Sequence, residues 1–518
     1  MPVKKRNPFL KNALFLSAVS ILMRGVAVSF SAWVNRKIGP ESMGLVTLTM
    51  SIYGFAVTLA LSSVNLGAVR LTSARCAGLE GADGESWRSA MRSVMRAVCL
   101  YSLLFGCTSG AALTVFSVPV AERLLGDMRT LRSLRVLALS LPFISLSSAL
   151  SGYFTGIRKV SKNAAATVTE QFVKIAVTSA SLMMILPGNV ESACFAVVGG
   201  SAVSEAWTLF LHLVFWATDS KRPKGAGKEG KSVRIRTRFL DGAAISFPAA
   251  VGTYARQGLT TLEHLAIPKG LIRNGLTRER ALSAYGLLQG IAFPLVMFPY
   301  AVIGSFTSLL VPEMSELKAR GDSEGIRRAV KKVYRASALF SLLACGIFVN
   351  YAEELGLLVY RSAEAARPTL ILGLLVPFMY LDTAVDAVLK GVGEQVYSMK
   401  VNIADAASGL ILVLLLTPAM GLDGYILTIW LCEVGNLAAS IRRLGKVTGN
   451  GIREAFPAYI RPGASVFAVS LVKRIFFRTF PPTVSMIAFV GLYVLFALGL
   501  PGRKSADVKR LHNTEPAV

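Results

Sequence analysis

The chain has 518 residues, of which 53% are hydrophobic and only 17% are charged, and its net charge is +26. A soluble domain alternates apolar and polar faces, so this composition excludes an ordinary soluble globular protein. The six cysteines and three histidines are scattered without metal-ligand spacing. We therefore expect no disulfide, no metal and no cofactor, and no hydrolase or metalloprotease site.

Apolar runs long enough to cross a bilayer recur along nearly the whole chain, because a span needs about 20 mostly apolar residues. The N-terminal half holds six of them, at 13–33, 43–68, 90–116, 134–154, 164–186 and 192–216. The C-terminal half holds the others, at 243–265, 284–311, 333–349, 368–389, 401–417, 424–441, 464–480 and 483–500. The sequence predicts an all-α polytopic membrane protein with about fourteen transmembrane helices.

The positive charge gathers in alternate connecting segments, most densely at 221–238 and 318–335 and in the C-terminal tail. Cytoplasmic loops carry an excess of Lys and Arg, so we expect both termini in the cytoplasm of a bacterial plasma membrane. Contact with anionic membrane lipids explains the remaining charge. No basic motif interleaved with aromatic residues is present, so nucleic acid is not expected as a partner.

The two halves look like copies of one unit. Arg24 lies within the first run with Lys37 thirteen residues later, and Arg256 lies within the seventh run with Lys269 at the same interval. We predict an N-terminal six-helix lobe (1–218), a basic linker (219–238), a C-terminal six-helix lobe (239–449) and two additional helices with a basic tail (450–518). An even number of spans per copy predicts a pseudo-two-fold axis along the membrane normal.

Ionisable side chains inside a span are costly and mark a cavity, a partner or a transport pathway. Arg24 and Arg256 occupy matching places in the two copies and keep their charge at any physiological pH. Either they line a wet cavity or they form structural ion pairs. Two guanidinium groups facing one cavity would suit a phosphate or pyrophosphate, which accepts bidentate hydrogen bonds.

The acids within the spans are candidates for ion coupling or for pairing inside the membrane. Glu170 and Lys174, and likewise Asp382 and Asp386, are one helical turn apart and share a face. The two aspartates form a candidate site for a coupling cation or proton, unless Lys390 at the end of the helix pairs with them. The other candidates in spans are Glu205, Asp405 and Glu433. We expect Glu263 at the outer interface, and Lys473 either at the membrane surface or in a groove.

Several segments carry a family resemblance: Arg24-Gly25, Gly39-Pro40-Glu41, Gly152-Tyr153-Phe154-Thr155-Gly156, Glu170-Gln171, Pro294 to Pro299, Leu310 to Glu316, Asp382 to Gly391 and Asn402 to Asp405. In these segments the chain resembles the stage V sporulation protein B group. That group lies in the polysaccharide-exporter branch of the MOP superfamily, which includes the lipid II flippases and MATE exporters. One departure is Glu263, which stands where the family pattern leads us to expect an aspartate.

The resemblance implies two lobes around a central cationic cavity, and movement of a lipid-linked saccharide or peptidoglycan precursor across the membrane. Because no nucleotide-binding motif is present, we expect neither ATP hydrolysis nor another enzymatic activity, and a monovalent cation or proton would drive the cycle. One alternative is a cation-coupled, MATE-like exporter of small cationic compounds. Another is a non-transporting scaffold that acts with proteins of cell-envelope synthesis.

Overall fold

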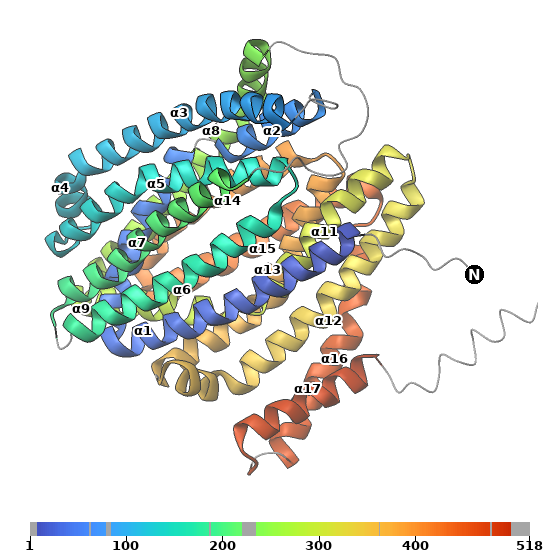
Figure 1. The fold of residues 1–518 in the computed structure, drawn as a ribbon. Coiled ribbons are helices and arrows are strands. Elements are labelled where there is room, and N and C mark those ends of the chain that lie inside the picture. The colour runs from blue at the N-terminus through green and yellow to red at the C-terminus, as the bar shows by residue number, and fades with distance from the viewer. Residues whose placement is uncertain are drawn as a thin grey trace, which may run out of the picture. The chain divides into compact units, whose positions relative to one another are not determined.

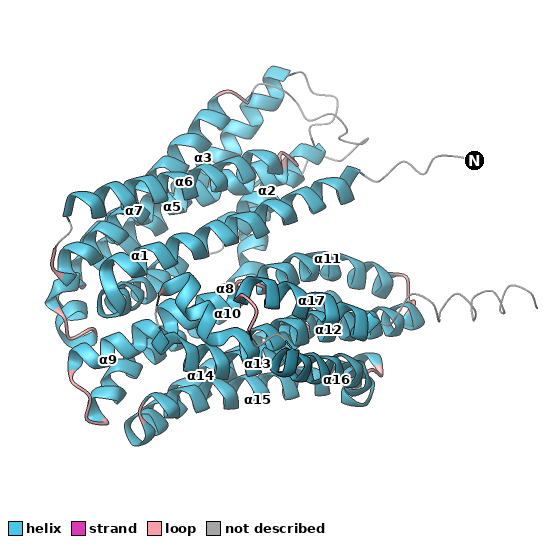
Figure 2. Cartoon of the chain, turned by 90° about the horizontal axis from the view of Figure 1, so that it is seen from below, coloured by secondary structure: helices cyan, strands magenta, loops and turns pink. Residues whose placement is uncertain are grey.

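The computed structural model describes residues 8–61, 64–78, 84–185, 188–219, 235–361, 363–476 and 479–498. All regular structure in these residues is helical, as predicted (Figure 2). The N-terminal leader, most of the predicted linker at 219–238 and the basic tail after residue 498 lie outside the described residues.

The helices of the first half are α1 (Pro8–Leu61), α2 (Val64–Gly78), α3 (Gly84–Val115), α4 (Ser117–Pro119), η1 (Val120–Leu124), η2 (Met128–Thr130), α5 (Leu131–Gly156), α6 (Val160–Ile185) and α7 (Val190–Ala217). Those of the second half are α8 (Ile235–Arg273), α9 (Arg278–Tyr285), η3 (Gly286–Ala292), α10 (Phe293–Met297), α11 (Tyr300–Ala319), α12 (Ser323–Leu355), η4 (Gly356–Tyr360), η5 (Ala363–Ala365), α13 (Ala366–Gly391), α14 (Gln395–Met420), α15 (Leu422–Thr448), α16 (Ile452–Phe476) and α17 (Pro482–Leu498).

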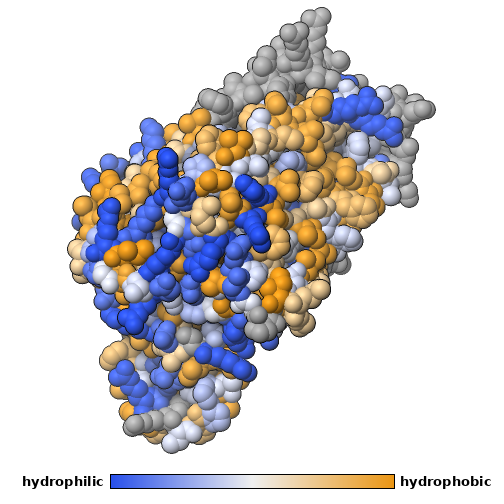
Figure 3. All heavy atoms as spheres, turned by 90° about the vertical axis from the view of Figure 1, so that its left-hand side faces the viewer, coloured by the Kyte–Doolittle hydropathy of each residue, from blue (hydrophilic) through white to orange (hydrophobic). Residues whose placement is uncertain are grey.

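The described residues contain ten helices long and apolar enough to cross a membrane. With the family evidence given below, they make this a multi-pass membrane protein. Figure 3 looks at the end of the molecule that carries α4 and α9, where hydrophilic side chains gather beside hydrophobic ones. This distribution is what helix ends need where they leave the hydrocarbon and meet water and headgroups. The predicted number of fourteen spans and the pseudo-two-fold axis remain predictions.

The chain divides into two compact units. Unit 1 comprises Met1–Ile291 and Asn402–Thr428, and unit 2 comprises Ala292–Val401 and Ile429–Val518. These boundaries differ from those of the predicted lobes, because α8, α9 and most of η3 group with the N-terminal helices, together with most of α14 and the start of α15. The division into lobes at 218 and 239 remains a prediction.

Helix α1 contains the first predicted span and most of the second, joined across a kink. Gly39 at the kink has φ +79°, a left-handed conformation that an L side chain adopts only with strain. Pro40 follows it and has no backbone N–H to continue the first helix. The Gly39-Pro40 pair therefore turns the chain between two spans with almost no connecting loop.

Unit 1 is organised around α1 and α5, which both contact α3 and α7 (Figure 1). One hydrophobic cluster joins α3, α5 and α7 through Trp87, Met95, Tyr153, Phe154 and Leu209. Gly152 and Gly156 let α5 approach α2 closely, since a Cβ at either position would lie within 3 Å of α2 atoms. The Gly-containing exit of this helix, noted in the sequence, is thus a packing feature.

The predicted span at 284–311 is not one continuous helix. The structure divides this stretch among the end of α9, the π-helical turn η3, α10 and most of α11. Pro294 and Pro299 cause the divisions, because each lacks a backbone N–H and its ring clashes with the preceding turn. Pro294 lies in the first turn of α10 and Pro299 directly precedes α11, positions that tolerate proline.

In unit 2, α12 packs against α13, α16 and α17. The two additional helices α16 and α17 are anchored on α12 through Tyr351, Val469, Phe489 and Tyr493. Lys473 of α16 lies in a groove against α12, with its ammonium nitrogen 3.8 Å from the centre of the Tyr351 ring and 3.7 Å from Glu354. It also donates a hydrogen bond to the Asn350 carbonyl. Lys473 therefore lies in a groove, which is one of the two places considered for it.

Candidate functional site

Arg24 and Arg256 both belong to unit 1, and both side chains are exposed. Arg24 lies in the first half of α1, where it has no ion-pair partner among the described residues. Arg256 lies on α8, close enough to Asp405 of α14 for the two charges to interact. An exposed guanidinium in a membrane span needs water or an anion beside it, so both remain candidates for the substrate cavity.

Helix α8 is held against the second half of α1 beside Arg256. Thr261 donates a hydrogen bond of 3.2 Å to the Ser51 carbonyl, and Gly258 packs against the Phe55 ring. A Cβ at Gly258 would lie 3.4 Å from that ring. The contact fixes which face of α8 turns toward α1, and hence the direction in which Arg256 and Glu263 project.

Two acids and one arginine come together on α8 and α14. The carboxylate charges of Glu263 and Asp405 act on one another, and Arg256 acts on Asp405. Gly409, one turn after Asp405, faces Glu263, since a Cβ there would lie 3.1 Å from a carboxylate oxygen of Glu263. Two carboxylates near one guanidinium can interact with the arginine. In its place, they can bind a proton or a small cation.

Glu263 was expected at the outer interface because the predicted run ends at 265, but helix α8 does not end there. Helix α8 continues ten residues beyond Glu263, to Arg273, which is about 15 Å at the helical rise of 1.5 Å per residue. His264 beside it is not exposed either, because its Nδ1 hydrogen-bonds to the hydroxyl of the buried Tyr285 at 2.8 Å. The predicted run ended before the helix does, because the polar residues in the last turns of α8 resemble a loop.

A second charged cluster lies between α6 and α7. The Lys174 charge interacts with both Glu170 and Glu205, although none of these three described residues forms a direct ion pair with another. Glu170 also lies near Thr208 of α7. Tyr53 of α1 shares a hydrogen bond of 2.7 Å with Ser140 and lies near both acids. The predicted Glu170–Lys174 pair is thus part of a larger cluster with one more acid than base.

The two aspartates of α13 have separate partners in unit 2. Asp386 pairs with Lys390 and accepts a hydrogen bond from Ser398, while Asp382 accepts one of 3.2 Å from Asn436. Lys390 therefore neutralises Asp386, which is the structural alternative considered for this pair. Glu433 is partly buried on α15.

Sequence reasoning missed one buried acid, Asp127, which is only 6% exposed. It forms ion pairs with Arg129 at 2.8 Å and Arg278 of α9 at 3.1 Å, and Arg129 also pairs with Glu41 of α1 at 3.2 Å. Burial alone would raise the pKa of Asp127, but hydrogen bonds from Arg129 and the two positive charges together lower it. Gly126 before it has φ +63° and marks the turn, but nothing in the sequence indicates distant partners.

The amino-acid sequence matches the model of a known family over residues 9–318, described as polysaccharide biosynthesis protein. The match covers more than half of the chain. The chain belongs to the polysaccharide biosynthesis protein family. Among similar proteins of Bacillus subtilis, stage V sporulation protein B is 25% identical over 442 residues, which are 82% of this chain and 81% of that protein. The sporulation protein YkvU is 20% identical over 362 residues, 69% and 77% of the two chains.

The fold of this chain is similar to those of solved membrane transporters. The lipid II flippase MurJ in an inward closed conformation has a TM-score of 0.68 at 11% identity and covers 96% of this chain and 100% of that one. A multidrug resistance MATE family transporter in an inward-facing conformation has a TM-score of 0.62 at 15% identity, over 86% and 98%. These similarities show the fold, and they confirm the resemblance seen in the sequence.

Proposed function

We propose that the protein moves a polyprenyl pyrophosphate-linked saccharide or peptidoglycan precursor across the bacterial cytoplasmic membrane by alternating access. A pyrophosphate and a sugar cannot enter hydrocarbon unaided, so their transfer needs a wet, cationic cavity. Arg24 and Arg256 would bind the pyrophosphate, and the polyprenyl tail would stay in the lipid. The observation that carries the proposal is the pair of exposed guanidinium groups on α1 and α8 of a family member.

The orientation of the chain belongs to the same proposal. The basic connecting segments and the positive-inside rule favour cytoplasmic N- and C-termini. With that orientation, the Gly39 kink and the start of α9 lie on the outer side of the membrane. The saccharide would enter from the inner leaflet, where such lipid intermediates are made, and leave toward the outer one.

A cation or a proton would drive the cycle through the acids of unit 1. Glu263 and Asp405 are the strongest candidates, because their charges act on one another and on Arg256. Binding of a cation between the carboxylates would free Arg256 for the pyrophosphate, which couples the two ligands at one place. The cluster of Glu170, Lys174 and Glu205 is the second candidate.

A second function is a cation-coupled exporter of small cationic compounds, as in MATE transporters. The surplus of acid in the Glu170, Lys174 and Glu205 cluster and the MATE-like fold favour it. Such a protein would need its acids to bind substrate and would tolerate loss of Arg24 and Arg256. The two functions therefore make opposite predictions for the same substitutions.

The experiment reconstitutes the purified protein in vesicles and follows transfer of a fluorescent lipid-linked saccharide. We expect Arg24→Ala with Arg256→Ala to lower the initial rate at least about a hundredfold, since each lost guanidinium–phosphate contact weakens binding by about 1.5–3 kcal/mol. The matched control is Arg335→Ala with Arg442→Ala, which removes two exposed arginines of unit 2 and should leave the rate within about twofold. Undiminished transfer by the first double variant would refute the proposed roles.

A further inference from the structure

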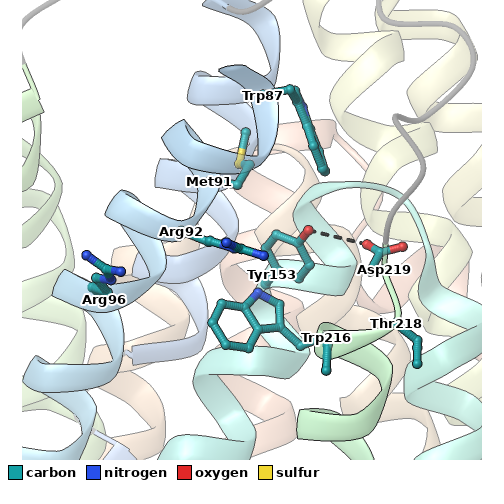
Figure 4. A pocket seen from close by; sticks show the side chains of 9 residues that line it. Trp87, Met91, Arg92, Arg96, Tyr153, Trp216, Thr218 and Asp219 are labelled. Atoms are coloured by element: carbon teal, nitrogen blue, oxygen red, sulfur yellow. Dashed lines mark hydrogen bonds between the residues drawn. The ribbon is translucent and has the colours of Figure 1, made fainter. Parts of the chain in front are cut away.

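A half-open pocket of about 690 Å³ lies in unit 1 where α3 begins and α5 and α7 end. Its lining comprises Trp87, Met91, Arg92, Arg96, Tyr153, Trp216, Ala217, Thr218 and Asp219. Figure 4 shows Arg92 extending from α3 toward Tyr153 and Trp216, with Asp219 on the opposite side. None of these residues belongs to the charged clusters described above, so the pocket is a separate feature.

The walls of the pocket are fixed. Trp87, Met91 and Tyr153 are at most 3% exposed and belong to the hydrophobic cluster that joins α3, α5 and α7. The Tyr153 hydroxyl donates a hydrogen bond of 3.3 Å to Asp219. A pocket with buried aromatic walls needs little rearrangement to receive a ligand.

The charge of the pocket is positive. Among the described residues that line the pocket, Asp219 is the only acid, and two lysines already neutralise it: Lys159 forms an ion pair with it, and the nitrogen of Lys162 lies 3.4 Å from its carboxylate. Arg92 and Arg96, one helical turn apart, are both exposed and have no ion-pair partner among the described residues. Two unpaired guanidinium groups beside a neutralised acid favour an anion.

The pocket also lies at a membrane boundary. Arg92 and Arg96 stand near the start of the candidate span Ser89–Val115, and Trp216 stands at the end of Val190–Ala217. Tryptophan and tyrosine are enriched where spans meet the headgroup layer. By the positive-inside rule this is the inner leaflet, which carries the anionic lipids.

Exposed apolar side chains continue from the pocket into the span. Leu100 and Leu104 follow Arg96 at four-residue intervals, so they lie on the same face of α3, and they are 68% and 60% exposed. Phe210, on the last turns of α7 before Trp216, is 54% exposed. A headgroup in the pocket would thus have apolar surface beside it for its acyl chains.

We propose that this pocket binds the phosphate headgroup of an anionic phospholipid of the inner leaflet. Arg92 and Arg96 bind the phosphate, Trp87 and Trp216 contact the glycerol region, and the acyl chains lie along Leu100 and Leu104. The site is distinct from the transported lipid and does not depend on the proposed transport, although its place in the inner leaflet rests on the orientation proposed above. Its occupant is a resident membrane lipid that ties the ends of α3 and α7 together.

Native mass spectrometry of the purified full chain tests the proposal, with phosphatidylglycerol, phosphatidylcholine and inorganic phosphate as separate probes. We expect phosphatidylglycerol to bind at least about tenfold more tightly than phosphatidylcholine, from about 1 kcal/mol for each arginine near the surface. Arg92→Gln with Arg96→Gln should abolish this preference, and Arg92→Lys with Arg96→Lys should retain most of it. Arg335→Gln with Arg442→Gln is the matched control and should bind like the wild type.

Three results would overturn the proposal. One is an unchanged preference for phosphatidylglycerol in the double glutamine variant. Another is equal binding of the two lipids by the wild type. The third is displacement of phosphatidylglycerol by millimolar inorganic phosphate, which would make the site one for free phosphate. If the double glutamine variant does not fold, the lysine variant and Leu100→Ser with Leu104→Ser test the proposal instead. The double serine variant should bind phosphatidylglycerol severalfold more weakly than the wild type.

The result of this lipid-binding test is independent of the result of the transport test. Arg24→Ala with Arg256→Ala should bind phosphatidylglycerol at this pocket like the wild type, because neither residue lines it. Failure of the flippase proposal would leave this binding unchanged, and loss of the lipid preference would leave the transport result standing.

Discussion

At the scale of single residues, the charged side chains on α6, α7, α8 and α14 of unit 1 interact in small clusters. Asp405 interacts with Glu263 and Arg256, and Lys174 interacts with Glu170 and Glu205. Charge of mixed sign lowers the cost of burial and leaves each cluster open to exchange of a cation or proton. Asp386, by contrast, already has two partners, because Lys390 forms an ion pair with it and Ser398 donates a hydrogen bond to it.

This difference gives a prediction for coupling. Glu263→Gln should remove the dependence of transport on a proton or sodium gradient and lower the driven rate about tenfold or more, since one carboxylate alone holds a cation poorly. Transport by vesicles with and without an imposed gradient measures it. Glu353→Gln, an exposed acid of unit 2, is the control and should keep the dependence. A gradient-dependent rate in Glu263→Gln would contradict the assignment.

Asp127 gives a prediction for stability. Its pKa lies below the ordinary value of 3.8, so its charged form stabilises the fold. This contribution is complete above about pH 4 and is lost as the pH falls through the lowered pKa. Asp127→Asn should lower the free energy of unfolding by about 1–2 kcal/mol at pH 7, because its two arginine partners are partly exposed and screened.

Thermal unfolding in detergent between pH 7 and pH 3 measures this effect. The Asp127→Asn protein should unfold at a lower temperature at pH 7, and the difference should shrink toward pH 3. Glu324→Gln is the control, because its pair with Arg327 is exposed and should contribute little. A difference that is constant with pH would show that the charge of Asp127 is not what stabilises the fold.

At the scale of elements, the crossing of α1 and α9 depends on two glycines. A Cβ at Gly286 would lie 2.1 Å from the Pro40 carbonyl oxygen, and one at Gly44 would lie 2.2 Å from that of Leu282. The two backbones are therefore in direct contact. The Asp127 ion pairs bind the same two helices, since Arg129 reaches Glu41 of α1 and Arg278 belongs to α9.

Gly286→Ala should therefore destabilise the protein by about 1–3 kcal/mol, the usual cost of forcing atoms into a packed contact. The melting temperature and the yield of monodisperse protein measure it. Gly199→Ala is the control, because nothing lies within 4 Å of a Cβ there, and alanine is a better helix former than glycine. Equal stability of the Gly286→Ala variant and the wild type would show that α9 moves away from α1 at little cost.

At the scale of the whole molecule, hydropathy located most spans because the bilayer requires long apolar runs. The predicted runs 134–154 and 192–216 lie within α5 and α7 and end within a few residues of them. The polar helix α9 was missed because Arg278 to Tyr285 contains three charged residues and no apolar run. Hydropathy alone does not register the division at Pro294 and Pro299, but each of these prolines removes a backbone hydrogen bond and permits a kink.

The candidate site was predictable only in part. Arg24, Arg256, Glu170 and Asp405 stand out in the sequence because a charge in a span is rare. Their companions do not: Gly409 carries no charge, Glu263 looked interfacial, and Asp127 lies in a loop where an acid is ordinary. Which charges meet across helices depends on packing, since Glu205 lies 31 residues after Lys174 and Asp405 lies 149 residues after Arg256. No local pattern encodes these contacts.

The central claim concerns the substrate, and one measurement tests it most directly. Vesicles containing the wild-type protein are given a labelled polyprenyl pyrophosphate saccharide and, separately, a small cationic dye, under the same imposed gradient. The account predicts rapid transfer of the lipid-linked saccharide and movement of the dye at the rate of protein-free vesicles. Transport of the dye without transfer of the saccharide would contradict it and establish the exporter of cationic compounds instead.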